Sequence, residues 1–366
     1  MERKPFIAAY LFDRGAEPVN PGSAGSVTPE DAKILDRINW AFGLCVDGKV
    51  SGAHWKGVGQ LKDLKAQNPH LKTILSVGGW GARGYSDACL TPQGREKFAQ
   101  SAIEIMLEYD FDGVDLDWEY PTIDAAGIDA RPEDKWTFTK MMWLIRAKMD
   151  ALSIVTKRYY HLSMAVGCGS EKYAQIMELA ELATFLDEIN LMSYDLRHGT
   201  SEITGHYTNL FSNPADSRPG SAKQSIDLFV EHGVPIEKLV IGSSFGSSGW
   251  TGVEPGETGT GLHAKSAAKA FRMFRPNAEG PRPPRGAMRD PAWQKENGFT
   301  RHWDDVAKAP YLYNGEVFIS YDDAESVTAK IDYVMERGMK GLMYWEYGGD
   351  PTGQLLKAME AARTKK

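Results

Sequence analysis

Short apolar runs alternate with longer amphipathic stretches along most of the chain. The short runs are bounded by polar or turn-forming residues, which is typical of strands. Their alternation with helical patterns predicts βα units and a parallel sheet. Eight runs are expected to be strands: Phe6–Phe12, Arg37–Phe42, Lys72–Val77, Gly113–Trp118, Tyr159–Val166, Glu188–Tyr194, Lys238–Ser243 and Gly341–Trp345.

Two long stretches between these runs carry apolar residues at helical spacing. Thr91 and Pro92 supply an N-cap and a first-turn proline for one of them. The two stripes are Phe98, Ala102, Ile105, Met106 and Tyr109, and then Phe138, Met141, Met142, Ile145 and Met149. We expect both stripes to cover the sheet, and Trp136 and Trp143 to be core residues. Eight strands with interposed helices predict a (β/α)₈ barrel, an α/β fold whose active sites lie at the carboxyl ends of the strands.

The fourth run leads into a dense group of carboxylates. Residues 112–119 read Asp-Gly-Val-Asp-Leu-Asp-Trp-Glu, with four carboxylates in eight positions. Because side chains alternate across a strand, Asp115, Asp117 and Glu119 share one face. Successive members lie roughly 6 to 7 Å apart, so like-charge repulsion should raise at least one pKa and keep a proton available near neutral pH. This pattern indicates acid-base chemistry.

Two other interpretations of this run are open. An exposed edge strand would merely solvate the carboxylates, but Phe111, Trp118 and Tyr120 favour burial. Clusters of Asp also hold Ca²⁺ or Mg²⁺, although strand spacing separates the oxygens whereas calcium loops wrap around a glycine turn. We therefore expect no metal and no other cofactor.

The chain between the seventh and eighth strands is far longer than one helix requires. Glycine-rich and proline-rich loops come first, and aromatic residues return after Phe299. A disordered loop is the alternative. We expect a small α+β insertion domain at residues 251–318 and a barrel domain at residues 1–250 and 319–366, with Ser320–Asp323 resuming the barrel.

Composition limits the class of partner. The chain has 366 residues, with 42 Lys and Arg against 49 Asp and Glu, a formal net charge of −7 and no long basic block. This balance disfavours nucleic acid. No apolar run is long enough to span a membrane, and three cysteines without metal spacing disfavour a disulfide framework. Met1–Lys4 is charged like the start of a signal peptide but lacks a following cleavage site, so we expect the next residues to form the first strand.

The acidic run resembles the Asp-x-x-Asp-x-Asp-x-Glu motif of family 18 glycoside hydrolases, the chitinase family, at all four acidic positions. Three further segments agree in order. Ser76–Trp80 resembles the family's Ser-x-Gly-Gly strand end, Met192–Asp195 resembles its Met-x-Tyr-Asp segment, and Gly341–Trp345 resembles the segment with a tryptophan under the reacting sugar. Residues 251–318 resemble the insertion domain of chitinases that have a deep cleft.

The resemblance implies retaining, substrate-assisted hydrolysis of β-1,4-linked N-acetylglucosamine in chitin or its oligosaccharides. Glu119 is implied to be the general acid, and the substrate's own N-acetyl carbonyl to attack the anomeric carbon. Asp117 would hold the acetamide nitrogen while Asp115 shares a proton with it, so the two should titrate as a unit. Tyr194 would donate its hydroxyl to the acetamide oxygen, and Asp195 would support the same pocket.

Further candidates follow from the same segments. The expected substrate-binding residues are Trp345, Tyr10, Trp80, Met192, Gly79 and Trp303. Trp345 should form the apolar floor for the sugar, whereas Tyr10, Trp80 and Trp303 are equally compatible with core packing. Ser76 and Asp112 are expected to support the site without touching the sugar; Asp112 is out of phase with the other three carboxylates.

One segment departs from the family pattern. After strand seven the family commonly has Pro-Phe-Tyr-Gly-Arg, whereas Ser244–Ser248 reads Ser-Phe-Gly-Ser-Ser. The missing tyrosine and arginine line the sugar cleft in relatives. We therefore expect altered substrate contacts, and the preferred substrate length stays open.

Other functions remain open beside chitin hydrolysis. An endo-β-N-acetylglucosaminidase would apply the same chemistry to N-glycans, and a chitinase-like lectin would bind without cutting, although such lectins typically lose the acid that Glu119 represents. An unrelated barrel enzyme would not need the acidic motif. We expect a monomer that is secreted or periplasmic, with its signal peptide absent from this sequence.

Overall fold

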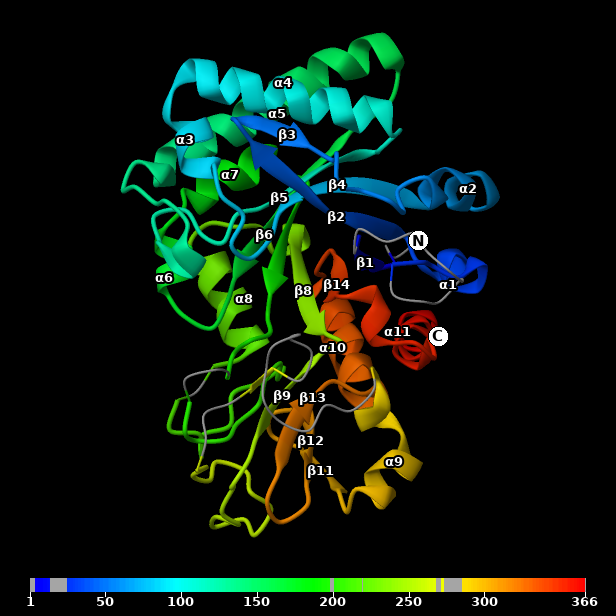
Figure 1. Cartoon of the computed structure of the whole chain (residues 1–366), viewed down its shortest axis with the longest axis vertical. Coiled ribbons are helices and arrows are strands. Elements are labelled where there is room, and N and C mark those ends of the chain that lie inside the picture. Colours follow the sequence, from blue (N-terminus) through cyan, green and yellow to red (C-terminus); the bar gives the residue numbers. More distant parts are fainter. Residues whose placement is uncertain are drawn as a thin grey trace.

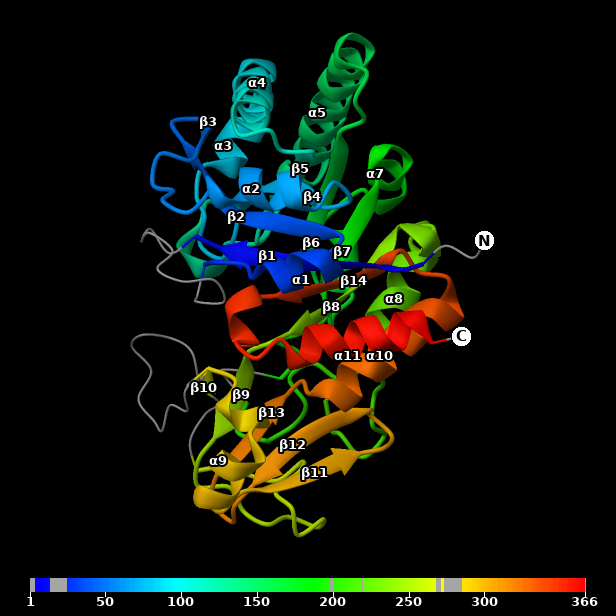
Figure 2. The same ribbon diagram turned by 90° about the vertical axis from the view of Figure 1, so that its right-hand side faces the viewer.

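The computed structural model describes residues 4–13, 25–197, 201–218, 220–267, 271–272 and 285–365. Eight parallel strands form a closed barrel, which confirms the predicted fold class (Figure 1 and Figure 2). Pairing follows the order β1-β14-β8-β7-β6-β5-β4-β2, and β2 pairs back with β1. The barrel strands are β1 (Phe6–Phe12), β2 (Arg37–Val46), β4 (Lys72–Gly78), β5 (Gly113–Asp117), β6 (His161–Gly167), β7 (Glu188–Met192), β8 (Leu239–Ser244) and β14 (Gly341–Trp345).

Every barrel strand overlaps its predicted run, and β4, β5, β6 and β8 differ from the predicted bounds by one or two residues. β1 and β14 have the predicted bounds. β2 continues beyond its expected end to Val46 and turns back into β3 (Lys49–Ser51) as an antiparallel hairpin. β7 ends at Met192, two residues before the predicted end, so Tyr194 lies beyond the sheet.

Helices cover the barrel. They are α1 (Pro29–Ile34), α2 (Gln60–Gln67), α3 (Tyr85–Leu90), α4 (Pro92–Glu108), α5 (Asp134–Thr156), α6 (Lys172–Gln175), α7 (Leu179–Phe185), α8 (Ala222–Glu231), α10 (Ala324–Arg337) and α11 (Gln354–Thr364). Single 3₁₀ turns are η1 (Ala125–Gly127), η2 (Ile236–Lys238), η3 (Ala287–Arg289) and η4 (Tyr347–Gly349). α4 begins after Thr91, whose side chain accepts a hydrogen bond from Gly94 N, as the N-cap pattern predicted.

The predicted core role of Trp136 and Trp143 is wrong. Both side chains are exposed, by 43% and 58%. The predicted stripe of α5 is buried from Phe138 to Met149 and faces the barrel. The two tryptophans are seven residues apart and so share a face, and this face lies away from the stripe.

A second, five-stranded sheet lies beside the barrel (Figure 1). Its strands, in spatial order, are β10 (Phe271–Arg272), β9 (Ser247–Trp250), β13 (Phe318–Tyr321), β12 (Ala309–Tyr313) and β11 (Thr300–Asp304), and α9 (Pro291–Glu296) precedes β11. β13 pairs antiparallel with β9 and β12, so Ser320 and Tyr321 belong to this sheet and do not resume the barrel as expected.

The limits of an insertion domain stay a prediction. Within residues 251–318, residues 268–270 and 273–284 lie outside the described part of the chain. β9 begins before residue 251 and β13 ends after residue 318, so the second sheet includes strands on both sides of the expected segment.

Three other features bear on the sequence expectations. Cys45, Cys89 and Cys168 are free thiols, as the absence of a disulfide pattern predicted. Met1–Arg3, at the charged start of the chain, lie outside the described residues. Among the residues that are described, no helix combines the length and apolar character needed to cross a bilayer.

Candidate active site

The acidic run lies at the carboxyl end of β5. The outer face of the strand carries Val114, Leu116 and Trp118, which are buried against the helices. The inner face carries Asp115 and Asp117, which are 0% and 4% exposed. The alternation of faces read from the sequence is therefore present, and it directs the carboxylates into the barrel.

Asp115 is held by donors from four different strands. Tyr10 and Ser76 donate hydroxyl hydrogen bonds to Oδ2 at 2.9 and 2.8 Å. Ser163 donates to Oδ1 at 2.6 Å, and Asn190 Nδ2 donates to the same oxygen at 3.1 Å. Both oxygens of this buried carboxylate are thus occupied by neutral donors, which fixes its orientation.

Asp117 is placed by the backbone of β4 and has a spare oxygen. Gly79 N donates to the Asp117 carbonyl at 2.9 Å, while Oδ1 of the carboxyl group has no hydrogen-bond partner among the described residues. Burial raises the pKa of Asp117 well above its ordinary value, and the charges of Glu119 and Asp115 raise it further. The cluster therefore retains a proton to higher pH than an isolated carboxyl group would.

Glu119 and Tyr194 lie above this pair at the mouth of the barrel. Both are half-buried. Burial raises the pKa of Tyr194 well above 10.0, and the charges of Asp117, Glu119 and Asp195 add to the effect. Burial and then the charge of Glu119 also raise the pKa of Tyr120. Both phenols therefore stay protonated, and so remain hydrogen-bond donors, at neutral pH.

Aromatic side chains line the same end of the barrel. Trp345 is half-buried and stacks on Phe42, with ring centres 5.5 Å apart and planes at 19°. Tyr10 and Phe12 meet the edge or side of Trp345, each at 6.0 Å. Met192 joins the same interior cluster. Tyr10 is only 2% exposed, so it supports Asp115 and Trp345 from within the core.

Two of the predicted substrate-binding tryptophans lie outside this aromatic group. Trp80 is 54% exposed, and its ring centre lies 6.4 Å from that of Tyr120, so it borders the mouth. Trp303 lies on β11, the edge strand of the second sheet, which both views place far from the barrel (Figure 1 and Figure 2). Its ring is covered by Arg301, whose guanidinium carbon lies 5.5 Å from the ring centre.

Asp112 lies at the opposite end of β5 from Glu119. It accepts a hydrogen bond from Thr73 N at 3.0 Å and forms ion pairs with Lys65 at 3.1 Å and Arg158 at 3.2 Å. Asp112 therefore ties β5 to β4 at the amino ends of these strands, and its contacts do not reach the carboxylate cluster.

The departure after strand seven is buried. Phe245 is 0% exposed and stacks on Tyr344 with ring centres 4.0 Å apart. Arg289 Nη2 donates to the Phe245 carbonyl at 2.9 Å, and Nη1 donates to the Gly349 carbonyl at 2.8 Å. Phe245 itself is thus a packing residue at the junction of barrel and second sheet.

Sequence reasoning missed Ser163 and Asn190, which complete the donor set around Asp115. A signal was available for Asn190, because it precedes Met192 and Tyr194 by two and four residues and must share their face. Ser163 is a lone small polar residue in an apolar strand and carries no such signal.

No metal site competes for these carboxylates in the described part of the chain. Among those residues, no group of three or more His, Cys, Asp or Glu side chains is arranged to hold an ion. A pocket of about 570 Å³ lies elsewhere, beside α8, and its lining includes Ser170, Glu171 and Lys223 but none of the candidate site residues.

Comparison with known proteins gives a consistent result. The model of glycosyl hydrolases family 18 matches residues 16–350. Chitinase A1 of Niallia circulans is 39% identical over 324 residues, which are 83% of this chain and 44% of that protein. Chitinase B of Serratia marcescens is 31% identical over 408 residues, 93% of this chain and 79% of that protein.

A solved structure agrees over the whole length. The family 18 N-acetylglucosaminidase of Paenibacillus barengoltzii superposes with a TM-score of 0.87 at 39% identity, covering 98% of this chain and 99% of that one. The chain spans less than half of chitinase A1, so the similarity concerns one part of that protein. With the barrel, the carboxylate cluster and the family model in agreement, the chain belongs to glycosyl hydrolases family 18.

Proposed function

We propose that this chain hydrolyses β-1,4 linkages between N-acetylglucosamine units of chitin or chito-oligosaccharides, with retention and with the substrate's acetamide as nucleophile. The single observation that carries the proposal is the buried pair of Asp115 and Asp117 beneath Glu119. One member has both oxygens occupied by donors, and the other has a raised pKa and a spare oxygen.

Each group has a distinct role in this chemistry. Glu119, half-buried at the mouth, protonates the leaving oxygen. Asp117 accepts the acetamide N–H with its unpartnered Oδ1 and so turns the acetamide oxygen toward the anomeric carbon. Tyr194 donates its hydroxyl to that oxygen, and a proton retained on the buried pair keeps the cluster from carrying three negative charges. Trp345 supplies the apolar floor for the sugar ring.

The site needs no second carboxylate as nucleophile. Asp115 is 0% exposed and enclosed by its donors, so it cannot attack the anomeric carbon. Asp117 is buried with it, and its raised pKa disfavours the ionised form that a nucleophile requires. Both features support a reaction in which the substrate supplies the nucleophile, the exception to the two-carboxylate scheme.

A second candidate is release of single N-acetylglucosamine units from chain ends. It is favoured by the full-length similarity to the Paenibacillus N-acetylglucosaminidase, whereas the curated relatives are chitinases. The chemistry is the same, and the two functions differ in which bond is cut.

A polymeric substrate implies that the protein is exported. A monomer suffices for activity because the described site is built from one chain.

The test is mass-spectrometric product analysis of an N-acetylglucosamine hexamer. Wild type is compared with Glu119→Gln and with Glu181→Gln, the same change on the exposed face of α7. We expect short oligomers from wild type and the control, and a rate at least about 10²-fold lower for Glu119→Gln, as for loss of a general acid.

The products decide between the candidates. Dimers and trimers as first products support chitinase action, and monomer alone supports the N-acetylglucosaminidase. An uncleaved hexamer would overturn both, and cleavage of an N-glycan core instead would identify an endo-β-N-acetylglucosaminidase. Oligomer binding without any cleavage would identify a lectin.

A further inference from the structure

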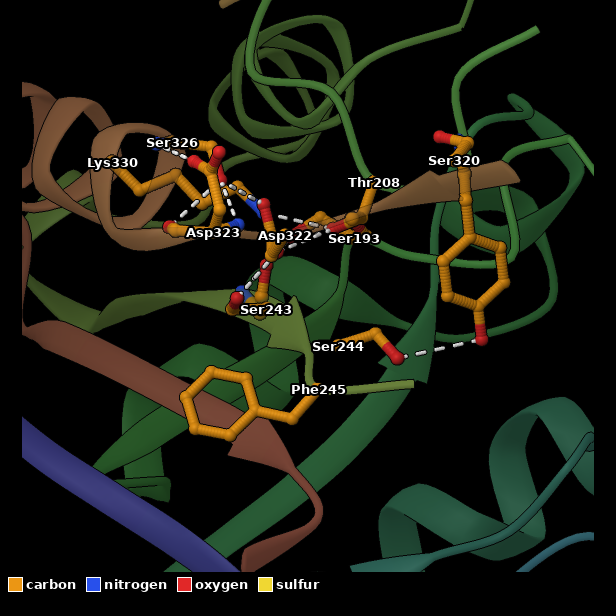
Figure 3. Close-up of polar contacts among 12 residues, drawn as sticks. Ser193, Thr208, Ser243, Ser244, Phe245, Ser320, Asp322, Asp323, Ser326 and Lys330 are labelled. Atoms are coloured by element: carbon orange, nitrogen blue, oxygen red, sulfur yellow. Dashed lines mark hydrogen bonds and ion pairs between the residues drawn. The ribbon is translucent and has the colours of Figure 1, made fainter. Parts of the chain in front are cut away.

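A buried ion pair lies outside the candidate site and has no part in the chemistry above. Lys330, in the middle of α10, donates to Asp322 Oδ2 at 2.6 Å (Figure 3). The two residues are 0% and 1% exposed. Burying both charges carries a desolvation cost that is recovered only when the geometry is good and other hydrogen bonds are satisfied.

Neighbouring hydroxyl groups provide those hydrogen bonds. Ser243 donates to Asp322 Oδ2 at 2.5 Å, and Ser326 donates to Oδ1 at 2.7 Å. Lys330 also donates to Thr208 Oγ1 at 2.8 Å. The pair therefore connects three segments: the end of β13 in the second sheet, the end of β8 in the barrel, and the segment after β7 that contains Thr208 (Figure 3).

Thr208 connects this network to the segment that carries Tyr194. Since Lys330 donates to Thr208 Oγ1, the one hydroxyl hydrogen is left for an acceptor. The nearer acceptor is the Ser193 carbonyl at 3.1 Å, against 3.3 Å for Asp322 Oδ2. Ser193 directly precedes Tyr194 in the chain.

The same two segments are joined at a second point. Leu196 N donates to the Tyr207 carbonyl at 3.1 Å, and Tyr207 N donates to Ser320 Oγ of β13 at 2.8 Å. Residues 193–196 are thus hydrogen-bonded to residues 207–208, and residues 207–208 are in turn hydrogen-bonded to the second sheet or to the residue that follows it. The backbone ladders of β7 end at Met192. The Ser193 hydroxyl is held by β8, because it donates to the Gly242 carbonyl at 2.8 Å and accepts from Gly242 N at 2.9 Å. The Ser193 carbonyl, which belongs to the peptide that leads into Tyr194, is held by Thr208.

We propose that Thr208, held by the buried Asp322–Lys330 pair, is a positioning residue that sets the place of the Tyr194 hydroxyl. The proposal rests on the role of Tyr194 in the proposed function. It assigns to the second sheet a part in building the active site, in addition to any part in covering a substrate. A misplacement of a catalytic group by about 1 Å can lower the rate by 10²-fold, so a small slackening of residues 193–196 is enough to be measured.

Three substitutions at and near position 208 test the proposal. Thr208→Val keeps the shape and removes the hydroxyl, and Thr208→Ser restores it. Thr328→Val makes the same change two residues before Lys330, at a hydroxyl that donates to Ala324 O in its own helix. Replacing Lys330 alone would leave Asp322 unpaired and is avoided because the chain would be strongly destabilised.

The kinetic readout is kcat on the N-acetylglucosamine hexamer. We expect Thr208→Val to lower kcat about tenfold, equal to about 1.4 kcal/mol, with KM within about twofold of wild type, and Thr208→Ser and Thr328→Val to keep wild-type kcat. In a Tyr194→Phe background, Thr208→Val should change kcat by less than about twofold, because the group that it positions is gone. A merely structural role predicts the same loss in both backgrounds.

Amide hydrogen exchange gives a readout that does not need activity. We expect faster exchange at Leu196 in Thr208→Val than in wild type and Thr208→Ser. If wild type cleaves the hexamer, an unchanged kcat in Thr208→Val, or an undiminished loss in the Tyr194→Phe background, overturns the proposal. If wild type cleaves nothing, the proposed function fails while exchange at Leu196 alone decides whether Thr208 holds this segment.

Discussion

Gly78 is the position where the smallest substitution should most disturb the carboxylate cluster. It ends β4 and pairs with Asp117 of β5, and its φ is +121°, a conformation that residues with a side chain rarely adopt. A Cβ atom at this position would lie 2.1 Å from the Asp117 carbonyl oxygen and 2.7 Å from the Tyr85 hydroxyl. Real Cβ contacts essentially never fall below 3.0 Å.

Gly78→Ala must therefore move β4 and β5 apart by about 0.9 Å at Asp117, since the obstacle is backbone. A displacement of about 1 Å in a catalytic group costs about 10² in rate. The forced backbone conformation adds a loss of about 1–3 kcal/mol in the free energy of unfolding. We expect both effects together: kcat on the hexamer falls about 100-fold, and the urea midpoint of unfolding falls as well.

The matched control is Gly59→Ala. Gly59 precedes α2 in a right-handed conformation, and a Cβ atom there has no neighbour within 4 Å. This variant should keep the wild-type kcat, with a stability change of no more than a few tenths of a kcal/mol. If Gly78→Ala matches Gly59→Ala in both kcat and urea midpoint, the close approach of β4 to Asp117 does not constrain the site and the reasoning is wrong.

Two further predictions concern charged groups. The pKa of Asp117 is raised in the folded chain. The protonated Asp117 side chain therefore stabilises the fold at acid pH, and this contribution is lost as the pH rises through the folded-state pKa. Asp117→Asn should therefore unfold at a higher temperature than wild type at neutral pH, and this gain should disappear near pH 4, while kcat falls at all pH values. A gain that grows toward pH 4 would contradict the prediction. The control is Asp124→Asn, the same change at an exposed position. Arg37→Met should leave the fully buried Glu188 without its close partner and lower the free energy of unfolding by about 3–5 kcal/mol. Lys340, 3.7 Å from Glu188, can offset part of that loss, and kcat measured well below the unfolding temperature should not change; an unchanged urea midpoint would refute the prediction.

The carboxylate cluster was predictable because it depends only on the two-residue alternation of side chains along a strand. Residues of a strand alternate between faces, so Asp115, Asp117 and Glu119 had to share a side wherever the strand lay. Ser163 was not predictable in this way, because its contact with Asp115 depends on the register between β5 and β6, where the two residues are paired. That register is a property of the closed barrel, which no single strand reveals.

Two errors in the fold have different origins. Helical spacing places Trp136 and Trp143 on a common face away from the buried stripe of α5, so the error was to assign the two residues to the core by their apolar character and not by their position. β13 pairs with β9 across about 70 residues of chain, and antiparallel partners so distant leave no local trace in either strand. The second error concerns long-range pairing and two strands that were not predicted, whereas the eight barrel strands were recognised from the local pattern.

The two halves of the candidate site differ in what holds them. Asp115 is paired with Ser76 of β4 and Ser163 of β6, and Asp117, the last residue of β5, is paired with Gly78 of β4, so the backbone ladder limits the movement of both. Tyr194 lies beyond the last paired residue of β7. It follows Ser193, whose hydroxyl is bonded to Gly242 of β8 and whose carbonyl is linked to the second sheet through Thr208. Hydrogen bonds of this kind contribute about 0.5–1.5 kcal/mol each, whereas opening the barrel ladder requires many to break together. Changes in the second sheet should therefore affect the step that needs Tyr194 well before they displace the acid cluster.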